Sequence, residues 1–360
     1  MEEFTILLRE IKKSKILLTP SSYNTLKTDL SLHSIHIDEI VRAQPKLKGK
    51  LNLKRGFVNL NAKLFYCLFI NNIYEFLNEL EKLSIPFVFT LYPGGGFQMN
   101  DEKCDFKLKK VLSSSMFKKV IVTQQITKDY LISKDYCSED KIELIFGGVV
   151  PQSSLKKDVS DRKNYFINKN TLDISFCAAK YMSKGVDKGY DVFIEFAHIL
   201  ASKYDFVRFH IIGGFDDTEI DVTKLNDRIV FYGYQKFENL ESLFKNMDIL
   251  ISPNKSFVLN KGSFDGFPLG TVVEAALNGV LVILSDDLNQ NRTFVNNEEL
   301  IIVKNDCYVI EQAVSDLIHN PKRINEIATK GRLKFQEVYS NATQMEPRIT
   351  LLKELIKESK

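Results

Sequence analysis

Residues 172–212 read LDISFCAAKYMSKGVDKGYDVFIEFAHILASKYDFVRFHII. This stretch begins and ends with apolar runs of strand length, residues 172–178 and 206–212. Between them, residues 190–203 carry apolar side chains at helical spacing: Val192, Phe193, Phe196, Ala197 and Leu200. A continuous apolar run is typical of a strand buried on both faces, and a helix with one apolar face can cover such a sheet. The stretch therefore predicts a strand–helix–strand unit with parallel strands.

The same alternation of strands and helices extends over most of the chain. We expect strands at 15–19, 63–70, 87–92, 119–123 and 142–146, then at 172–178, 206–212, 228–232, 247–252, 280–284 and 299–303. The two series are separated near Gly147 and Gly148 by a polar, lysine-rich stretch, residues 151–170. This pattern predicts an α/β fold of two facing Rossmann-like domains with parallel sheets. We expect these domains at 1–148 and 149–342, followed by an amphipathic helix at 343–360 that packs back toward the first domain.

Composition excludes several classes of protein. The net charge of +3 is too small to indicate a nucleic-acid partner, and five scattered cysteines without a C-x-x-C pair indicate a reducing compartment. The longest apolar stretch, residues 64–70, is far shorter than the roughly 20 residues of a membrane span. The start of the chain is acidic and lacks the basic residues of a secretory signal. We therefore expect a cytoplasmic protein.

Several enzyme motifs are absent. The sequence contains no P-loop, no G-x-G-x-x-G after a strand, no H-E-x-x-H and no G-x-S-x-G. It also lacks the D-x-D element with which many metal-dependent glycosyltransferases hold a cation. We therefore expect no cofactor and no dedicated divalent-metal site.

The most informative motif is FDGFPLGTVVEAALNG at residues 264–279, between two predicted strands. A helix is expected from about Leu269, and the free N–H groups at its start can bind an anion such as a diphosphate. Glycines allow the backbone to approach that ligand closely. Glu274 lies in the first turns, where its carboxylate can accept hydrogen bonds from the two hydroxyls of a ribose. The alternative is a loop and a buried helix, with Asp265 as a cap and Glu274 in solvent.

This motif is similar to the donor-binding motif of the family 4 retaining glycosyltransferases, which have the GT-B fold. The resemblance implies that Asp265 lies near the transferred sugar and that Glu274 binds the ribose. It also implies donor contacts along the turn and the helix start: Gly266, Phe267, Pro268, Leu269, Gly270 and Thr271. In the family pattern seven residues separate the two acids, whereas eight separate them here, and the first acid here is Asp.

A second motif, residues 177–193, resembles the first strand, loop and helix of the family's nucleotide domain. The resemblance implies that Lys180 and Lys188 hold the diphosphate, with Lys180 where the family usually has Arg. Such cations stabilise a leaving group that gains negative charge, so Lys188 is an expected catalytic residue. Asp265, which the resemblance implies lies near the transferred sugar, is the other. The alternative for each lysine is a solvated surface position. There are two lesser matches. Residues 231–234 resemble the family segment that lies near the nucleobase, and residues 211–214 resemble the end of the strand before that segment.

In the first domain, FVFTLYPGGGF at residues 87–97 is a predicted strand that leads into a glycine-rich turn. Loops at the carboxyl ends of parallel strands border the ligand cleft, so we expect Tyr92, Gly94, Gly95 and Gly96 on the acceptor or sugar side. The family commonly has histidine near the position of Tyr92. A tyrosine can donate a hydrogen bond but cannot reproduce the proton chemistry of imidazole at neutral pH. The alternative is a tight turn with Tyr92 packed in the core.

A basic segment is the last feature. Residues 41–74 contain seven Lys and Arg and no acid, and all seven lie within 41–63. Each basic residue near an anionic membrane contributes about 1 kcal/mol, so the 41–63 segment is a candidate for peripheral contact with the inner face of the membrane. The alternative is a solvated loop.

Together these features predict a metal-independent, retaining glycosyltransferase of the hexosyltransferase type. It would use a nucleoside diphosphate sugar, of the UDP or GDP type, and a glycan or lipid-linked acceptor, as in the synthesis of cell-surface polysaccharides. Two alternatives remain. One is a GT-B sugar-nucleotide epimerase, and the other is a partner subunit that binds a sugar nucleotide without catalysis.

Overall fold

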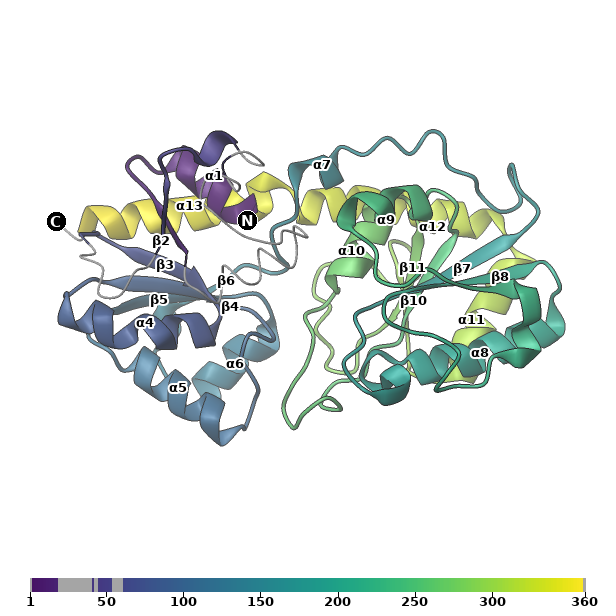
Figure 1. The fold of residues 1–360 in the computed structure, drawn as a ribbon, viewed down its shortest axis with the longest axis horizontal. Coiled ribbons are helices and arrows are strands. Elements are labelled where there is room, and N and C mark those ends of the chain that lie inside the picture. Colours follow the sequence, from purple (N-terminus) through teal and green to yellow (C-terminus); the bar gives the residue numbers. More distant parts are fainter. Residues whose placement is uncertain (1, 19–40, 42–44, 54–60, 359–360) are drawn as a thin grey trace.

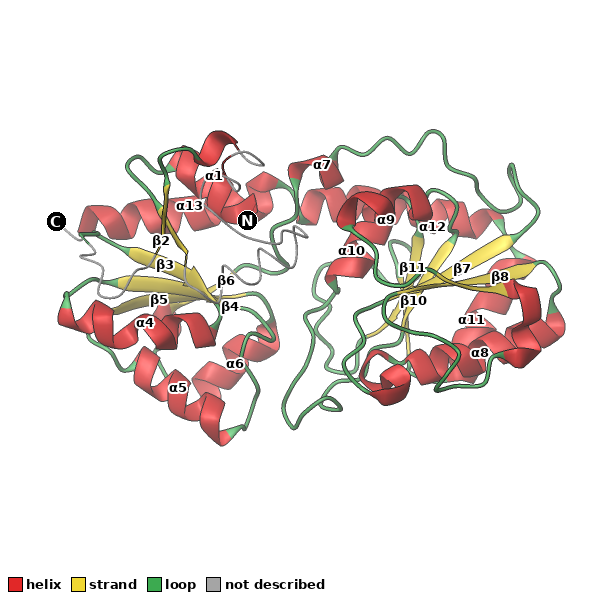
Figure 2. Ribbon diagram, viewed as in Figure 1, coloured by secondary structure: helices red, strands yellow, loops and turns green. Residues whose placement is uncertain are grey.

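The computed structural model describes residues 2–18, 41, 45–53 and 61–358. Two parallel sheets lie side by side, and helices cover both faces of each (Figure 1). Figure 2 shows the same layers by type of element, with strands between helices in both halves. The predicted α/β fold of two Rossmann-like domains is confirmed.

The first domain is built on a sheet with the strand order β3-β4-β5-β6, all parallel. The strands are β3 (Phe65–Leu68), β4 (Phe87–Leu91), β5 (Phe117–Val122) and β6 (Ile142–Leu144). Three helices connect them: α4 (Ile70–Lys82), α5 (Glu102–Leu112) and α6 (Gln125–Ser133). A separate parallel pair, β1 (Ile16–Leu18) and β2 (Leu51–Leu53), precedes this sheet in the chain.

The second domain is built on a parallel sheet with the order β12-β11-β10-β7-β8-β9. Its strands are β7 (Leu172–Cys177), β8 (Val207–Ile212), β9 (Ile229–Phe231), β10 (Ile249–Ser252), β11 (Leu281–Ser285) and β12 (Ile301–Val303). The chain starts this sheet in the middle, at β7, adds β8 and β9 on one side and then crosses to β10 on the other. The border between β7 and β10 is therefore a topological switch point, where open parallel sheets bind their ligands.

Alternation along the strands places apolar side chains on both faces of the second sheet. Leu281 and Ile283 of β11 belong to the same core as α8 (Tyr190–Lys203) and α11 (Cys307–His319). Val282 and Leu284 face the other core, with α10 (Gly270–Leu277) and α12 (Lys322–Val338). Strands buried on both faces read as the continuous apolar runs seen in the sequence.

The C-terminal helix α13 (Asn341–Glu358) follows α12 and returns to the first domain (Figure 1). Its Met345, Leu352 and Leu355 pack with α1 (Glu2–Glu10) against Val88 of β4 and Ile121 of β5. The expectation that this helix packs toward the first domain is confirmed.

The remaining described elements are short. They are η1 (Pro45–Leu47), η2 (Glu139–Lys141), α7 (Gln152–Leu155), η3 (Ser183–Lys188), η4 (Thr223–Arg228) and α9 (Phe237–Phe244). No helix within the described ranges is long and apolar enough to cross a bilayer.

Sequence and structure differ in two places. The apolar run 63–70 is divided, because β3 ends at Leu68 and α4 begins at Ile70. The strand Leu51–Leu53 was not predicted, because it is three residues long and lies in a lysine-rich stretch. Of the basic 41–63 segment, residues 42–44 and 54–60 lie outside the described part of the chain.

Candidate functional site

The loops that follow β7 and β10 meet at the switch point. Gly189 ends the loop after β7 with φ +70°, and a Cβ added there would lie 1.9 Å from the carbonyl oxygen of Pro253, directly after β10. Only glycine combines this left-handed backbone with such a close approach. The contact brings the loop that carries Lys188 against the loop that leads to Asp265.

Lys188 and Asp265 form an ion pair at this point, 77 positions apart in the chain. Lys188 Nζ donates to Asp265 Oδ2 at 2.5 Å and lies 4.0 Å from Asp187 Oδ2. Asn254 Nδ2 donates to the same Asp265 oxygen at 2.9 Å. Lys188 is only 4% exposed, whereas the Asp265 side chain is 41% exposed. The structure therefore joins both residues predicted to be catalytic in one partly open pair.

The Asp187 carboxylate is buried beside this pair. Neither of its oxygens has a hydrogen-bond partner among the described residues. Burial raises its pKa, and the Lys188 ammonium opposes that shift. Lys188 is therefore the nearby cation that compensates the buried charge.

Helix α10 begins next to the pair with open amide groups. Its first backbone hydrogen bond runs from Val273 N–H to the carbonyl of Leu269, so the N–H groups of Gly270, Thr271 and Val272 precede it. A Cβ at Gly270 would meet no atom within 4 Å, so the helix start is accessible there. These groups can bind an anion, as predicted for the 266–271 turn.

A shallow, partly open pocket adjoins Asp265 at the carboxyl ends of β10 and β11. Residues from three loops line it: Asn254, Lys255, Ser256, Asp265, Gly266, Phe267, Leu269, Ser285, Asp286, Asp287 and Gln290. The buried Gln290 donates from Nε2 to the carbonyl of Asp265 at 3.4 Å, while its Oε1 has no partner among the described residues. Gln290 was not predicted, because nothing in its local sequence marks it.

The first domain also contacts the 264–269 turn. Gln124, which follows β5, is buried and donates from Nε2 to the carbonyl of Phe267 at 3.2 Å. A Cβ at Gly266 would lie 3.4 Å from the same nitrogen. The ring of Phe264 packs against Phe97 at 5.8 Å between centroids. The predicted donor turn therefore lies between the two domains, and Pro268 joins it through a cis peptide bond after Phe267.

Glu274 is buried on α10, with 5% exposure. Its carboxylate forms an ion pair with the buried Lys157 and accepts from Asn278 Nδ2 at 3.2 Å. Lys157 was not predicted, since it lies in a lysine-rich stretch without a motif. The predicted ribose ligand thus already has a cationic partner.

Lys180 lies in the same loop as Lys188 but has a different partner. Its Nζ is 3.0 Å from Glu219 Oε2, and its backbone N–H donates to the Tyr234 hydroxyl at 3.3 Å. The ring of Tyr234 covers Gly214, where a Cβ would lie 2.6 Å from a ring carbon. The predicted nucleobase segment is therefore in contact with the lysine loop.

In the first domain, Tyr92 lies in a buried polar cluster. Its hydroxyl donates to Glu3 Oε2 at 3.5 Å, and Glu3 also pairs with Arg348 Nε at 3.6 Å. Burial, together with the Glu3 charge, raises the pKa of Tyr92. Glu3 was not predicted, because its partners come from distant parts of the chain.

The glycines after Tyr92 allow a helix to approach. Gly94, Gly95 and Gly96 all have positive φ. A Cβ would lie 2.2 Å from the Phe69 ring at Gly95 and 2.2 Å from the Asn71 amide at Gly96. The turn therefore packs against the start of α4.

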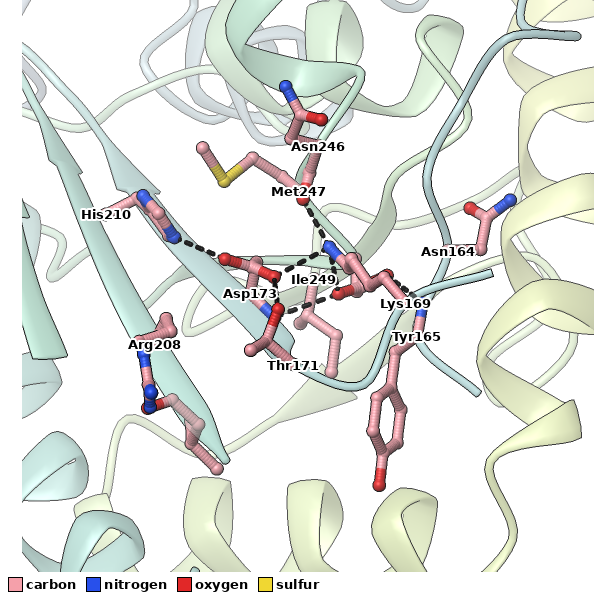
Figure 3. Close-up of polar contacts among 12 residues, drawn as sticks. Asn164, Tyr165, Lys169, Thr171, Asp173, Arg208, His210, Asn246, Met247 and Ile249 are labelled. Carbon is pink, nitrogen blue, oxygen red and sulfur yellow. Dashed lines mark hydrogen bonds and ion pairs between the residues drawn. The ribbon is translucent and has the colours of Figure 1, made fainter. Parts of the chain in front are cut away.

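A second polar cluster lies at the other end of the strands of the second sheet, where the central strands β7 and β10 begin. Lys169 and His210 both point toward Asp173 (Figure 3), at 2.7 Å in each case. Lys169 also pairs with Asp248 at 2.8 Å. Burial alone would raise the pKa of Asp173, but the hydrogen bonds from His210 and Lys169 lower it to about 2. Ligands bind at the carboxyl ends of parallel strands, so this cluster at the amino ends is structural.

Within the described part of the chain, no three His, Cys, Asp or Glu side chains are grouped so that they could hold a metal ion.

A comparison with protein families matches most of the second domain. Residues 179–334 match the family described as "Glycosyl transferases group 1". This range contains the Lys180–Lys188 loop and the 264–279 motif. A comparison with curated proteins found no match.

Solved structures resemble the chain over 82% to 98% of its length. A glycosyltransferase from Rickettsia africae is 17% identical, covers 96% of this chain and 100% of its own, and has a TM-score of 0.62. HepE from Anabaena, solved with UDP and glucose, is 12% identical with a TM-score of 0.66, and the match covers 98% of this chain and 96% of HepE. A TarM variant from S. aureus, solved with UDP, fondaparinux and α-GlcNAc-glycerol, is 14% identical with a TM-score of 0.57. This match covers 82% of the present chain and 56% of TarM. Identities this low show the shared fold, which is GT-B.

Proposed function

We propose that this chain is a glycosyltransferase that moves one sugar from a nucleoside diphosphate sugar to a glycan or lipid-linked acceptor. The observation that carries the proposal is the Lys188–Asp265 pair, which lies at the switch point of the second sheet beside the open start of α10. The match of residues 179–334 to the group 1 glycosyltransferases supports it. We assign donor binding to the 149–342 domain and acceptor binding to the 1–148 domain, with the 343–360 helix as a separate C-terminal element that packs on the first domain.

The donor's diphosphate would bind between the lysine loop and the helix start. When the glycosidic bond breaks, the departing diphosphate gains negative charge. The Lys188 ammonium and the N–H groups of Gly270 and Thr271 would stabilise that charge, with Lys180 as a second cation. Glu274 would bind the ribose hydroxyls while the ion pair with Lys157 holds its carboxylate in place.

The transferred sugar would lie against Asp265 and the adjoining pocket. Asp265 Oδ2 accepts from Lys188 and Asn254, so a sugar hydroxyl would add to an existing network. We propose that the reaction retains the anomeric configuration, as the resemblance of the 264–279 motif to the retaining glycosyltransferases implies. We also propose that it needs no metal, because the two lysines and the helix amides supply the positive charge that a cation would otherwise provide. UDP in HepE and TarM supports a UDP-type donor, with GDP as the next candidate.

The acceptor would approach the 264–269 turn from the first domain, next to Gln124. Contact of the 41–63 segment with the inner face of the membrane, in the cytoplasm, would bring a lipid-linked acceptor to the protein. Such an acceptor fits a role in cell-surface polysaccharide synthesis.

The test is a thermal-shift screen of the whole chain against UDP, GDP, CDP, ADP and their common sugars, each with and without EDTA. A ligand at 100 times its dissociation constant stabilises the folded state by about 2.7 kcal/mol, which gives a readily visible shift. We expect one nucleotide to stand out and EDTA to change nothing. If no nucleotide shifts the transition, the donor site is wrong.

One observation favours a second candidate, a sugar-nucleotide-binding partner subunit without catalysis. Tyr92 stands where family members commonly have a sugar-contacting histidine, and its hydroxyl already donates to Glu3. This candidate predicts nucleotide binding without donor turnover, with or without acceptor. Release of the nucleoside diphosphate from the donor contradicts it, and interconversion of donor sugars without acceptor would indicate an epimerase instead.

A further inference from the structure

Glu219 is an acid in the candidate site that no motif predicted. It lies in the loop that follows β8, next to the lysine loop that follows β7, because β7 and β8 are neighbours in the sheet. Its Oε2 lies 3.0 Å from Lys180 Nζ and also accepts the backbone N–H of Lys184. The hydrogen bond from Lys184 and the nearby Lys180 charge lower its pKa, so Glu219 is ionised at neutral pH.

The contact with Glu219 is also part of how the lysine loop is folded. Lys184 and Gly185 both have φ +55°, a left-handed conformation that costs energy in a non-glycine residue. A Cβ at Gly185 would lie 2.4 Å from the ring of Phe215, in the same loop as Glu219. Glu219 therefore makes two separable contributions, an acceptor for the Lys184 N–H and a charge opposite Lys180.

We propose that Glu219 competes with phosphate oxygens for Lys180 and thereby sets the affinity for the diphosphate of the donor and of the leaving nucleotide. This inference rests on the proposed function, which makes Lys180 a ligand of the diphosphate. Before the nucleotide binds, Glu219 occupies the cation. When the nucleotide binds, Lys180 exchanges its carboxylate for a phosphate, and when the nucleotide leaves, the carboxylate returns.

The exposure of the two side chains makes this exchange feasible. Lys180 is 20% exposed and Glu219 is 32% exposed, so solvent and ligand reach both groups. Partly exposed pairs of this kind typically contribute little to stability, whereas hydrogen bonds from an ammonium to a phosphate are stronger. Lys188, by contrast, is buried between Asp187 and Asp265 and keeps its position. Lys180 is thus the adjustable cation of the site and Lys188 the fixed one.

Two substitutions separate the contributions of Glu219. Glu219→Gln keeps an oxygen that can accept the Lys184 N–H but removes the charge, and Glu219→Ala removes both. The whole chain is titrated calorimetrically with UDP and GDP, and with uridine and guanosine as ligands without phosphate. We expect Glu219→Gln to lower the dissociation constant of the preferred nucleoside diphosphate about 3- to 5-fold, the effect of one partly exposed ion pair. The dissociation constant of the nucleoside should not change. Asp217→Asn is the matched control, because it removes one exposed carboxylate from the same loop and should change affinity less than 2-fold.

A double-mutant cycle with Lys180→Gln tests the partner directly. In the Lys180→Gln background, Glu219→Gln should no longer increase the affinity for the nucleoside diphosphate, since the cation for which carboxylate and phosphate compete is gone. If Glu219→Gln binds like the wild-type chain while Glu219→Ala binds more weakly, Glu219 only holds the loop and the inference is wrong. It is also wrong if Asp217→Asn tightens binding equally. If the wild-type chain binds neither UDP nor GDP, the proposed function itself fails, which is a different result from binding that Glu219 does not affect.

Discussion

Replacement of Lys188 by glutamine separates the structural and chemical roles of this residue. The ammonium lies 2.5 Å from Asp265 and 4.0 Å from Asp187, and Asp187 is buried without a hydrogen-bond partner among the described residues. Asp265 is 41% exposed and can be hydrated once the lysine is gone, so the energetic cost falls on Asp187. Breaking a buried pair costs about 3–5 kcal/mol. We expect a loss of about 3 kcal/mol in the free energy of unfolding of Lys188→Gln at pH 7.

The loss should depend on pH with a definite sign. Burial raises the pKa of Asp187, so its unpaired charge destabilises the fold above that pKa and no longer does so once the group is protonated. The difference between wild type and Lys188→Gln should therefore shrink as the pH falls toward 4. Urea unfolding at several pH values measures it. The double variant Asp187→Asn/Lys188→Gln should regain at least about 1 kcal/mol at pH 7, because the buried charge is absent.

Activity should respond differently. Removing one preorganised group that stabilises transition-state charge typically lowers the rate by about 10²–10³. We expect that fall in kcat for Lys188→Gln and for the double variant, although the double variant is more stable. Lys184→Gln, an exposed lysine of the same loop, is the control. A kcat within threefold of wild type at saturating donor refutes the role of Lys188, and an unchanged free energy of unfolding refutes the argument from Asp187.

Three further predictions follow from other parts of the structure. Gly189→Ala should lower the free energy of unfolding, measured in urea, by about 2–5 kcal/mol, because its Cβ would lie 1.9 Å from a carbonyl oxygen at a residue with left-handed backbone. Gly270→Ala should lower it by almost nothing, because a Cβ there meets no atom within 4 Å. Equal losses would contradict the packing argument. Asp173→Asn should lower the free energy of unfolding at pH 7 by about 2 kcal/mol and flatten its decline in acid. An Asp173 pKa of about 2 contributes stability that is present above pH 4 and lost as the pH falls toward 2. An unchanged decline of the unfolding free energy between pH 4 and pH 2 would contradict this prediction. Gln124→Ala should lower kcat about 10-fold without changing the affinity for the nucleotide, because it removes the first domain's hydrogen bond to the Phe267 carbonyl. Steady-state kinetics measures kcat and calorimetry measures the affinity. A change in affinity with an unchanged kcat would contradict this prediction.

Much of the fold could be predicted because its central strands are buried on both faces. The run at 280–284 becomes β11 (Leu281–Ser285), and the quoted strand–helix–strand stretch becomes β7, α8 and β8. The strand Leu51–Leu53 escaped prediction because three residues carry no periodicity. Its pairing with β1 is a tertiary contact that no local pattern reports.

The site could be predicted only in part. Lys188 and Asp265 were recognised from motifs, but their ion pair depends on the switch point that brings the ends of β7 and β10 together. Lys157 and Glu219 escaped because each is an ordinary charged residue in a polar stretch, paired with a residue 117 or 39 positions away. Gln124 directly follows a predicted strand, so the rule that ligands lie at carboxyl ends could have marked it.

The return of α13 to the first sheet means that the first domain is assembled from two separate parts of the chain. A fragment that stops at 148 would leave Val88 and Ile121 with α1 but without α13, the second helix that packs on them, and would expose part of that apolar face to water. Any dissection or exchange of the domains therefore has to carry residues 341–358 along with the first sheet. The polypeptide also passes between the domains twice, after β6 and again after α12. Two covalent links restrict how one domain can turn relative to the other more than one link would, so we expect opening and closing to follow a single hinge axis through both crossings.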